Sequence, residues 1–416
     1  MARPVNPLVS NVVIIVGIAA LVGAAWVGYS ALVVLLGLAL AMALVTKLWS
    51  RLCLKGVTCE RRLSEQRVFP GDEVLLTLRV VNRKLLPLPW IEVDDKIPAS
   101  LTPMTTPEQR GVVTLSRSTP LLWYRAASFS ERLNCSARGY YPLGPMSVTS
   151  GDIFGLSPRS RAQADIDHLI VYPRTYALAD LSIPSLSHLG EARSELRVFD
   201  DPSRLVGVRE YRPGDSLRRI HWKASARSGA LQVKLFEYTT DLKVDVFLAI
   251  DTFAGRPQED LELGISTAAS VARHLLEKDV QTGLFANTKL ADTQHAARIP
   301  AGAGTAHLTL LLEALAKTTE EVGEPFVDFF DRERGELGFG GTLVFVVGEI
   351  SPEIGLLTAD LARAGRHVLG FHIGKHSRGT HTRGIRWHKI HRPATPGHKK
   401  AADAAAGPAS AEAEVA

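Results

Sequence analysis

The stretch 244–250 (VDVFLAI) is an almost unbroken apolar run, the pattern of a strand that is buried on both faces of a parallel sheet. Segments with helical spacing and further short apolar runs alternate after it. We expect helices at 261–276, 306–316 and 352–364, and strands at 280–286, 342–347 and 367–373. Alternating strands and helices predict a doubly wound, mostly parallel α/β sheet over residues 241–392.

Residues 57–173 instead carry the period of an antiparallel sheet. In 67–82 (RVFPGDEVLLTLRVVN) a Pro-Gly-Asp turn precedes alternating apolar residues, so Val74, Leu76, Leu78 and Val80 are expected on one face. Further turn clusters that contain Pro follow along the segment. We therefore predict an antiparallel β-sandwich domain, and we find no catalytic grouping in its sequence.

Two segments lack either period. Residues 174–200 contain several Ser and Pro residues and are expected to form a linker. Residues 393–416 are rich in Pro, Ala, Gly and Glu, a composition that cannot bury enough apolar surface to order a chain. We predict that they form a disordered tail.

The first 50 residues are strongly apolar. The stretches 8–26 and 29–45 contain no charge, and each is roughly long enough to cross ~30 Å of hydrocarbon as a helix. Only Val27 and Gly28 separate them, so we predict a transmembrane helical hairpin. A cleaved signal peptide is the alternative for the first stretch, but a second apolar stretch follows at once and no small-residue cleavage site precedes polar sequence.

Charge sets the expected orientation of this hairpin. The basic residues outside it are Arg3 before it and Lys47, Arg51, Lys55, Arg61 and Arg62 after it. By the positive-inside rule, both termini and the soluble domains lie on the cytoplasmic side of the plasma membrane. The three cysteines show no paired spacing, which agrees with a reducing compartment. Part of the net charge of +5 thus lies beside the membrane, where it can bind anionic lipid headgroups.

More positive charge is concentrated in a basic segment, residues 201–240, between the two soluble domains. Within 204–234 (RLVGVREYRPGDSLRRIHWKASARSGALQVK) eight Lys or Arg stand against two acidic residues, and this surplus of +6 exceeds the surplus of the whole chain. Pro213 and Gly214 predict a turn. Asp215 is placed to cap a helix that begins at Ser216, and Gly229 is placed to end it.

On this expected helix Leu217, Ile220 and Ala224 form one face, and basic residues form a row beside it. A basic helix with a stacking ring can bind an acidic partner. The candidate interaction residues are Arg209, Arg212, Asp215, Arg218, Arg219, His221, Trp222, Lys223 and Arg227.

Two other interpretations of the basic segment stay open. Its charges can form internal ion pairs, Arg212 with Asp215 and Arg209 with Glu210 or Glu237, while the Trp222 ring packs on the domain core. The segment can also bind nucleic acid. That interpretation is disfavoured, because the sequence lacks the interleaved aromatic residues of a stacking platform.

The basic segment resembles the signature of the family known as domain of unknown function 58. The matching residues are Tyr211 to Asp215, Arg218 to Ile220, Trp222 with Lys223, Ala226 with Arg227, and the strand 233–237. Residues 140–145 and 152–156 resemble the end of that family's sandwich, with Ile153 where Pro is usual. The resemblance implies a membrane hairpin, a β domain and a von Willebrand factor A-like sheet. It implies partners among MoxR-type AAA+ ATPases and other von Willebrand A-like proteins, and it implies no firm activity.

Asp251 follows the first strand of the predicted sheet, where such sheets bind ligands. Von Willebrand A domains carry Asp-x-Ser-x-Ser there as ligands for Mg²⁺, but residues 251–255 read DTFAG and lack both hydroxyl positions. A structural carboxylate is therefore favoured over a metal ligand. A zinc site is also disfavoured, because the C-terminal histidines lack regular ligand spacing. They are His367, His372, His376, His381, His388 and His391.

No Walker A run and no His-Glu-x-x-His motif occurs in the sequence. We therefore expect a non-enzymatic protein without catalytic residues or a cofactor, a membrane-anchored scaffold or adaptor that binds protein partners and membrane lipid. The first alternative is an Mg²⁺-dependent ligand-binding module. The second is a membrane-linked nucleic-acid binder.

Overall fold

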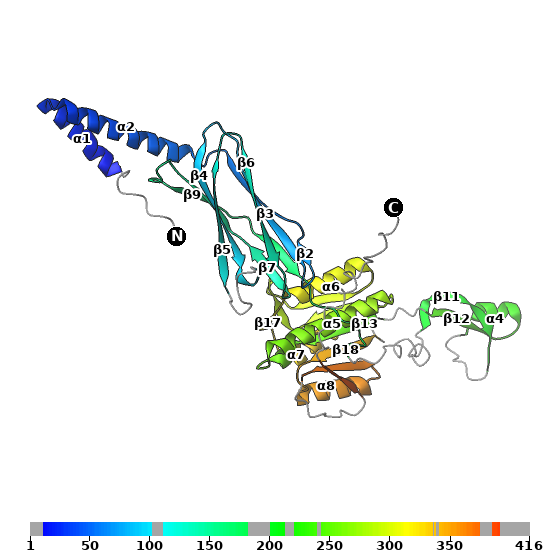
Figure 1. Ribbon diagram of the computed structural model, residues 1–416. Coiled ribbons are helices and arrows are strands. Elements are labelled where there is room, and N and C mark those ends of the chain that lie inside the picture. The colour runs from blue at the N-terminus through cyan, green and yellow to red at the C-terminus, as the bar shows by residue number, and fades with distance from the viewer. Residues whose placement is uncertain are drawn as a thin grey trace, which may run out of the picture. The chain divides into compact units, whose positions relative to one another are not determined.

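The computed structural model describes residues 11–101, 111–181, 200–212, 220–238, 243–335, 337, 341–374 and 385–391. The chain forms two compact units, residues 1–174 with 315–317, and residues 175–314 with 318–416 (Figure 1). The predicted tail and residues 182–199 of the predicted linker lie outside the described residues. The chain is thus multidomain, with apolar helices first and a large β-rich region after them.

Two apolar helices begin the described chain, α1 (Asn11–Val27) and α2 (Ser30–Leu52). Gly28, whose φ of 87° suits glycine, lies in the short connection between them. A Cβ at Gly17 would lie 3.0 Å from the Leu40 side chain, so the missing side chain allows the two helices to approach closely. By length and composition α2 can cross a membrane, whereas α1 is a shorter apolar helix.

Ten strands follow among the described residues of the first unit. They are β1 (Val57–Leu63), β2 (Arg67–Val68), β3 (Glu73–Asn82), β4 (Leu88–Pro98), β5 (Val112–Leu121), β6 (Ala126–Asn134), β7 (Gly139–Leu143), β8 (Met146–Ser150), β9 (Arg159–Gln163) and β10 (Asp167–Val171). They pair in the orders β1-β3-β6, β5-β4-β8-β9 and β2-β10-β7. The first two sheets are antiparallel and share one apolar core. The alternation predicted for 74–80 is confirmed, because every second residue of β3 is buried.

One buried ion pair crosses this core. The Arg61 guanidinium donates to the Asp95 carboxylate, with Nε and Oδ2 2.9 Å apart, and also to Asp167 at 3.0 Å. The side chains of Arg61 and Asp95 are 3% and 0% exposed. Arg61 was counted among the basic residues that follow the second apolar stretch, but its guanidinium is buried and held by carboxylates of β4 and β10, so it is not exposed to lipid headgroups.

The second unit contains a six-stranded sheet in the order β16-β14-β13-β18-β19-β20. Its strands are β13 (Lys243–Ala249), β14 (Gln281–Ala286), β16 (Ala297–Gly302), β18 (Thr342–Val347), β19 (Val368–Ile373) and β20 (Arg386–Ile390). All pair in parallel except β16, which is antiparallel to β14. The predicted mostly parallel sheet is confirmed, and the sequence did not reveal β16 or β20.

Helices cover both faces of this sheet. They are α5 (Gln258–Glu277), α6 (Thr305–Lys317), α7 (Phe326–Glu333) and α8 (Pro352–Arg363). The rings of Phe247 and Phe345 pack on one face with Phe326, Phe329 and Phe330 of α7. Helix α5 packs on the sheet from the other side, where alternate residues of β13 point. A two-stranded sheet, β15 (Thr288–Leu290) with β17 (Thr318–Val322), lies beside these elements.

Candidate functional site

The basic segment folds as a two-stranded antiparallel sheet that carries a short helix. Strand β11 (Asp200–Glu210) pairs with β12 (Gln232–Tyr238), and helix α4 (Trp222–Ser228) lies between them in the sequence. Ile220 forms a bridge with Val233, and both side chains are buried. Ile220 and Val233 thus form a small apolar core beneath a surface that is otherwise basic.

Side chains fix both ends of α4. His221 is the N-cap, and its Nδ1 accepts a hydrogen bond from the Ala224 N–H at 3.1 Å. Gly229 ends the helix with φ 72°, and its N–H donates to the Ser225 carbonyl at 3.0 Å. The Ser225 hydroxyl accepts from the Gln232 N–H at 2.8 Å, which ties the helix to β12.

The predicted start of this helix is wrong, and its predicted end at Gly229 is confirmed. The helix begins at Trp222, because Ile220 is held in pairing with Val233 and cannot share a helical face with Ala224. Asp215, Arg218 and Arg219 lie outside the described residues, as does the predicted turn.

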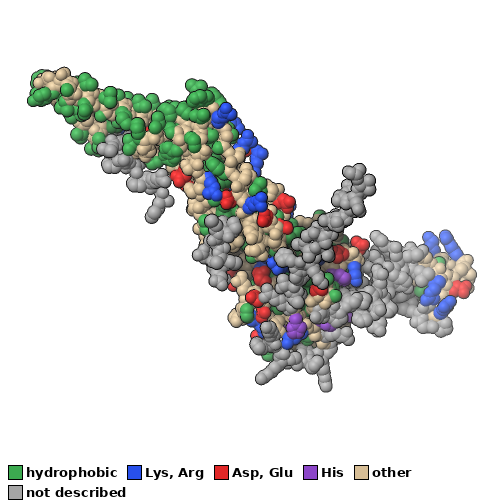
Figure 2. Space-filling model, viewed as in Figure 1, with side chains coloured by type: hydrophobic (Ala, Val, Ile, Leu, Met, Phe, Trp, Pro, Cys, Tyr) green, Lys and Arg blue, Asp and Glu red, His purple; other side chains and the backbone are tan. Residues whose placement is uncertain are grey.

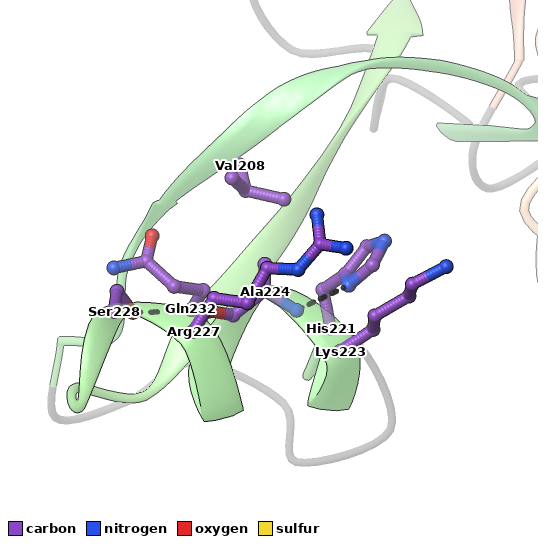
Figure 3. A pocket seen from close by; sticks show the side chains of 7 residues that line it. All are labelled: Val208, His221, Lys223, Ala224, Arg227, Ser228 and Gln232. Carbon is purple, nitrogen blue, oxygen red and sulfur yellow. Dashed lines mark hydrogen bonds between the residues drawn. The ribbon is translucent and has the colours of Figure 1, made fainter.

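A pocket of about 570 Å³ opens between α4 and the strands (Figure 3). Its lining residues are Val208, His221, Lys223, Ala224, Arg227, Ser228 and Gln232. Lys223 and Arg227 are one helical turn apart and exposed, and we find no ion pair to either among the described residues. Figure 2 shows Lys and Arg side chains on the surface of this region.

The proposed internal contacts of the basic segment are only partly described. Trp222 is 69% exposed, which does not favour the alternative in which its ring packs on the domain core. The Arg209 guanidinium donates to the backbone carbonyl of Glu210 at 3.0 Å. Arg212 is exposed, whereas its expected partner Asp215 and the side chain of Glu237 lie outside the described residues.

Asp251 lies directly after β13, in the 3-10 turn Ile250–Phe253. Its Oδ2 accepts from the Phe326 N–H at 2.8 Å and so holds the start of α7, whereas its Oδ1 is buried and has no hydrogen-bond partner among the residues that the structure describes. The Thr252 hydroxyl donates to the Ala249 carbonyl at 2.6 Å and accepts from the Gly348 N–H at 2.8 Å. These groups stabilise the carboxyl edge of the sheet.

The residues at this edge do not fit an Mg²⁺ site. One Asp251 oxygen is available, but the hydroxyl of Thr252 and the side-chain oxygen of Asn287 bind backbone groups. Throughout the described ranges, no three His, Cys, Asp or Glu side chains gather as a ligand set. His372 is buried in β19, and burial lowers its pKa, an effect that the Arg256 charge reinforces. His376 and His381 lie outside the described residues.

Comparison with known proteins finds a family whose model matches part of this chain. Residues 207–328, which include the signature 209–237, match the family model described as Protein of unknown function DUF58. The chain is 23% identical over 284 residues to the uncharacterized protein YeaD of Bacillus subtilis (strain 168), an alignment that covers 68% of each chain.

Two solved structures resemble parts of the chain. The CARDB domain of a Pyrococcus furiosus protein, in complex with di-metal ions, is 11% identical with a TM-score of 0.20, and covers 28% of this chain and 91% of its own. The sporulation control protein Spo0M of Bacillus subtilis is 15% identical with a TM-score of 0.17, and covers 38% and 58%. These scores are far below those of proteins that share a fold, so neither structure bears on function.

Proposed function

We propose that this chain is a membrane-anchored adaptor that holds an acidic protein partner against α4. The observation that carries the proposal is the exposed face of Trp222, Lys223 and Arg227, for whose charges the described part of the chain supplies no counter-ion. Unpaired cations attract and orient a negatively charged partner. Trp and Arg are also the residue types that contribute most binding energy at protein interfaces.

The hydrogen bonds of α4 support this role, because they fix the binding face before a partner arrives. The helix is capped at His221 and Gly229, and the Ser225 hydroxyl fastens it to β12. A preformed face loses less conformational entropy on binding than a flexible one.

The partner class follows from the family resemblance. We propose a MoxR-type AAA+ ATPase or another von Willebrand A-like protein as the acidic partner. The strand order of the second unit, with β13 and β18 central and helices on both faces, supports a von Willebrand A-like assignment. The proposal assigns no reaction to the chain, since the polar groups after β13 bind backbone atoms.

The anchor is a hairpin of α1 and α2 in the plasma membrane, with both termini and both soluble units in the cytoplasm. Helix α2 has 23 residues and spans about 34 Å, enough for a hydrocarbon core. Because the connection at Gly28 is short, α2 runs back across the membrane to the side on which α1 begins. Lys47, Arg51 and Lys55 then lie on the cytoplasmic side.

Charge reversal on α4 tests the adaptor role. The full chain in nanodiscs is titrated with the purified MoxR-type ATPase of the same cell, and binding is followed by interferometry. The Lys223→Glu and Arg227→Glu double variant is expected to weaken binding about tenfold or more, since two attractive charges become repulsive. Higher salt should weaken the wild-type complex in the same direction.

Arg79→Glu is the matched control, because Arg79 is exposed on β3 and its charge lies outside the α4 face. Equal affinity of the wild type and the α4 double variant would exclude this face as the contact. Steep salt-dependent binding of single-stranded or duplex nucleic acid, lost in the double variant, would favour the nucleic-acid alternative instead.

A further inference from the structure

The last turns of α2 are built into the core of the first unit. Cys53 is fully buried there, and Trp49 and Leu54 pack against the same apolar cluster. Ser50 is buried as well, and its hydroxyl donates to the Ser157 carbonyl at 2.6 Å. The helix therefore enters the sandwich as one of its packed elements, and it does so beside the loop that contains Ser157.

The carbonyl groups that α2 leaves open at its end are bound by side chains of the sandwich. The Lys84 ammonium donates to the carbonyls of Leu52 at 3.0 Å and of Lys55 at 2.8 Å, and also to that of Cys53. Just beyond the helix end, the Arg161 guanidinium donates to the Leu54 carbonyl at 3.4 Å and to the Val57 carbonyl of β1 at 2.5 Å. These contacts satisfy the helix end and fix the direction of α2 relative to the sandwich.

Three loops around this junction carry large apolar side chains on their surfaces. Their residues Leu85, Leu122, Trp123, Tyr124, Ile153 and Phe154 are each 53 to 75% exposed. The first two loops are adjacent, because the Tyr124 N–H donates to the Lys84 carbonyl at 3.3 Å. The third contains Ser157, which contacts α2 directly. All three tips thus surround the point where α2 enters.

The third loop is held in a shape that displays its apolar residues. The buried Asp152 carboxylate accepts from the N–H groups of Phe154 at 3.1 Å and of Ser157 at 2.8 Å. The Trp90 indole N–H donates to the Asp152 carbonyl at 3.0 Å. The exposure of Ile153 and Phe154 is therefore built into the loop rather than a result of loose packing.

Basic residues accompany these tips. The exposed cations near the junction are Arg51, Lys55, Arg83, Arg125 and Arg159. The one acidic residue in the three loops, Asp152, is buried. Figure 2 shows hydrophobic side chains that continue from the helices onto the adjoining end of the sandwich, with Lys and Arg beside them.

We propose that this end of the sandwich rests on an anionic lipid surface, with the three loop tips inserted in the membrane interface around α2. The inference rests on the proposed anchoring. If α2 crosses the membrane, the loop tips around its C-terminal end lie at the membrane interface, where the apolar surface of α2 ends. Trp and Tyr favour this level, and each Lys or Arg near anionic headgroups adds attraction. The sandwich is then a membrane-bound platform rather than a freely tethered domain.

Depth-dependent quenching tests the inference in the full chain. The three native cysteines are buried, so a single cysteine introduced on the surface takes up an environment-sensitive fluorophore selectively. Labelled Trp123→Cys and Phe154→Cys proteins are placed in nanodiscs of phosphatidylcholine and phosphatidylglycerol. Lipids with a nitroxide near the headgroup are expected to quench both labels at least twofold.

Two control positions separate this inference from the anchor. Asn134→Cys lies at the other end of β6, about 26 Å along the strand from Ala126, and should not be quenched. Leu38→Cys on the exposed surface of α2 should be quenched by nitroxides deep in the acyl chains.

Quenching at Leu38 without quenching at positions 123 and 154 would overturn the platform and keep the anchor. No quenching at Leu38 would overturn the anchor itself. Labels that are shielded from aqueous iodide but not quenched by nitroxide lipids would show that the tips contact a protein partner or a second copy of the chain, and would overturn the platform. Equal quenching in phosphatidylcholine alone would overturn the anionic surface.

Discussion

Arg61 of β1 and Asp95 of β4 form an ion pair inside the β sandwich, where neither side chain has more than 3% of its surface exposed. The pair joins the two main sheets, since β1 belongs to one and β4 to the other. Buried ion pairs contribute little net stability, but loss of Asp95 removes the buried carboxylate partner of Arg61 and leaves its guanidinium paired with Asp167, whose side chain is 40% exposed. We expect Asp95→Ala to destabilise the first unit by about 3–5 kcal/mol.

The three cysteines allow this effect to be measured in the full chain, because all are buried in the first unit. Burial raises the pKa of Cys59 and of Cys135 to about 11, so both thiols stay protonated and react only on unfolding. Thiol labelling against denaturant should show an earlier midpoint for Asp95→Ala. Arg132→Ala, whose ion pair with Glu73 is exposed, should change stability by less than about 1 kcal/mol. Equal midpoints for both variants would refute the structural role of the pair.

A second prediction concerns Asp245, a carboxyl group buried in β13 opposite Gly283 of β14. Burial raises its pKa to about 6 from 3.8. The folded state therefore favours the protonated form. The stability that this group contributes is complete below the unfolded pKa of 3.8 and is lost as pH rises through about 6. At pH above 7 the shift corresponds to a cost of about 3 kcal/mol as an upper limit.

Asp245→Asn removes this charge and keeps the shape of the side chain. By calorimetry, the variant should melt at a higher temperature than the wild type above pH 7, and the difference should shrink toward pH 4. Glu320→Gln on the exposed surface of β17 serves as the control and should show no such trend. A difference that stays constant over this pH range would contradict the assignment.

A third prediction tests the left-handed residue that ends α4. Gly229 has φ 72°, so Gly229→Ala should cost about 1 kcal/mol in the stability of the basic segment, whereas Gly229→Asn should cost less. If α4 is the contact face, Gly229→Ala should also weaken partner binding by a few fold, mainly through fraying of its last turn. Hydrogen exchange of the amides 225–229 measures the first effect and interferometry the second. Faster exchange with unchanged affinity would separate the fold of α4 from the proposed contact.

The sequence predicts those elements whose side-chain period is set by burial. Strand β3 alternates because one face packs in a core, and β13 is apolar throughout because both faces are covered. Only Ala297 of the edge strand β16 (ARIPAG) is buried, so the strand shows neither period. Helix α7, with eight residues, is too short for helical spacing to be distinguished from a strand.

The basic segment was only partly predictable for a different reason. The residues Asp215 and Ser216 form a local helix-start signal, but the pairing of Ile220 with Val233 joins positions thirteen apart and delays the helix to Trp222. The cap at Gly229 was predictable because it depends on glycine alone. No local signal predicts that Lys84 binds the carbonyls of α2, because the partners are 29 to 32 residues apart.

A fourth prediction distinguishes a structural Asp251 from a metal ligand. Asp251→Ala leaves the Phe326 N–H without its acceptor and should lower stability by about 1–3 kcal/mol, whereas Asp251→Asn keeps an acceptor and should lower it less. By calorimetry, the wild type and each variant are expected to melt at the same temperature with millimolar Mg²⁺ as without it. An Mg²⁺-dependent rise that both substitutions abolish would restore the metal-dependent alternative.

The last prediction concerns the rigidity of the junction between α2 and the sandwich. Lys84→Met keeps most of the apolar stem but removes the donor that binds the Leu52 and Lys55 carbonyls. Spin labels at Met42→Cys on α2 and Asn134→Cys on β6 report the helix direction as a distance distribution in nanodiscs. We expect one narrow distribution for the wild-type junction and a broader one for Lys84→Met, with Arg79→Met unchanged from the wild type. If Lys84→Met stays narrow, Arg161 and the burial of Cys53 are sufficient to fix the helix, and the ammonium serves only to satisfy its terminal carbonyls. If the wild-type distribution is itself broad, the sandwich is not held at a fixed angle to α2, and the loop tips cannot lie at one depth in the membrane.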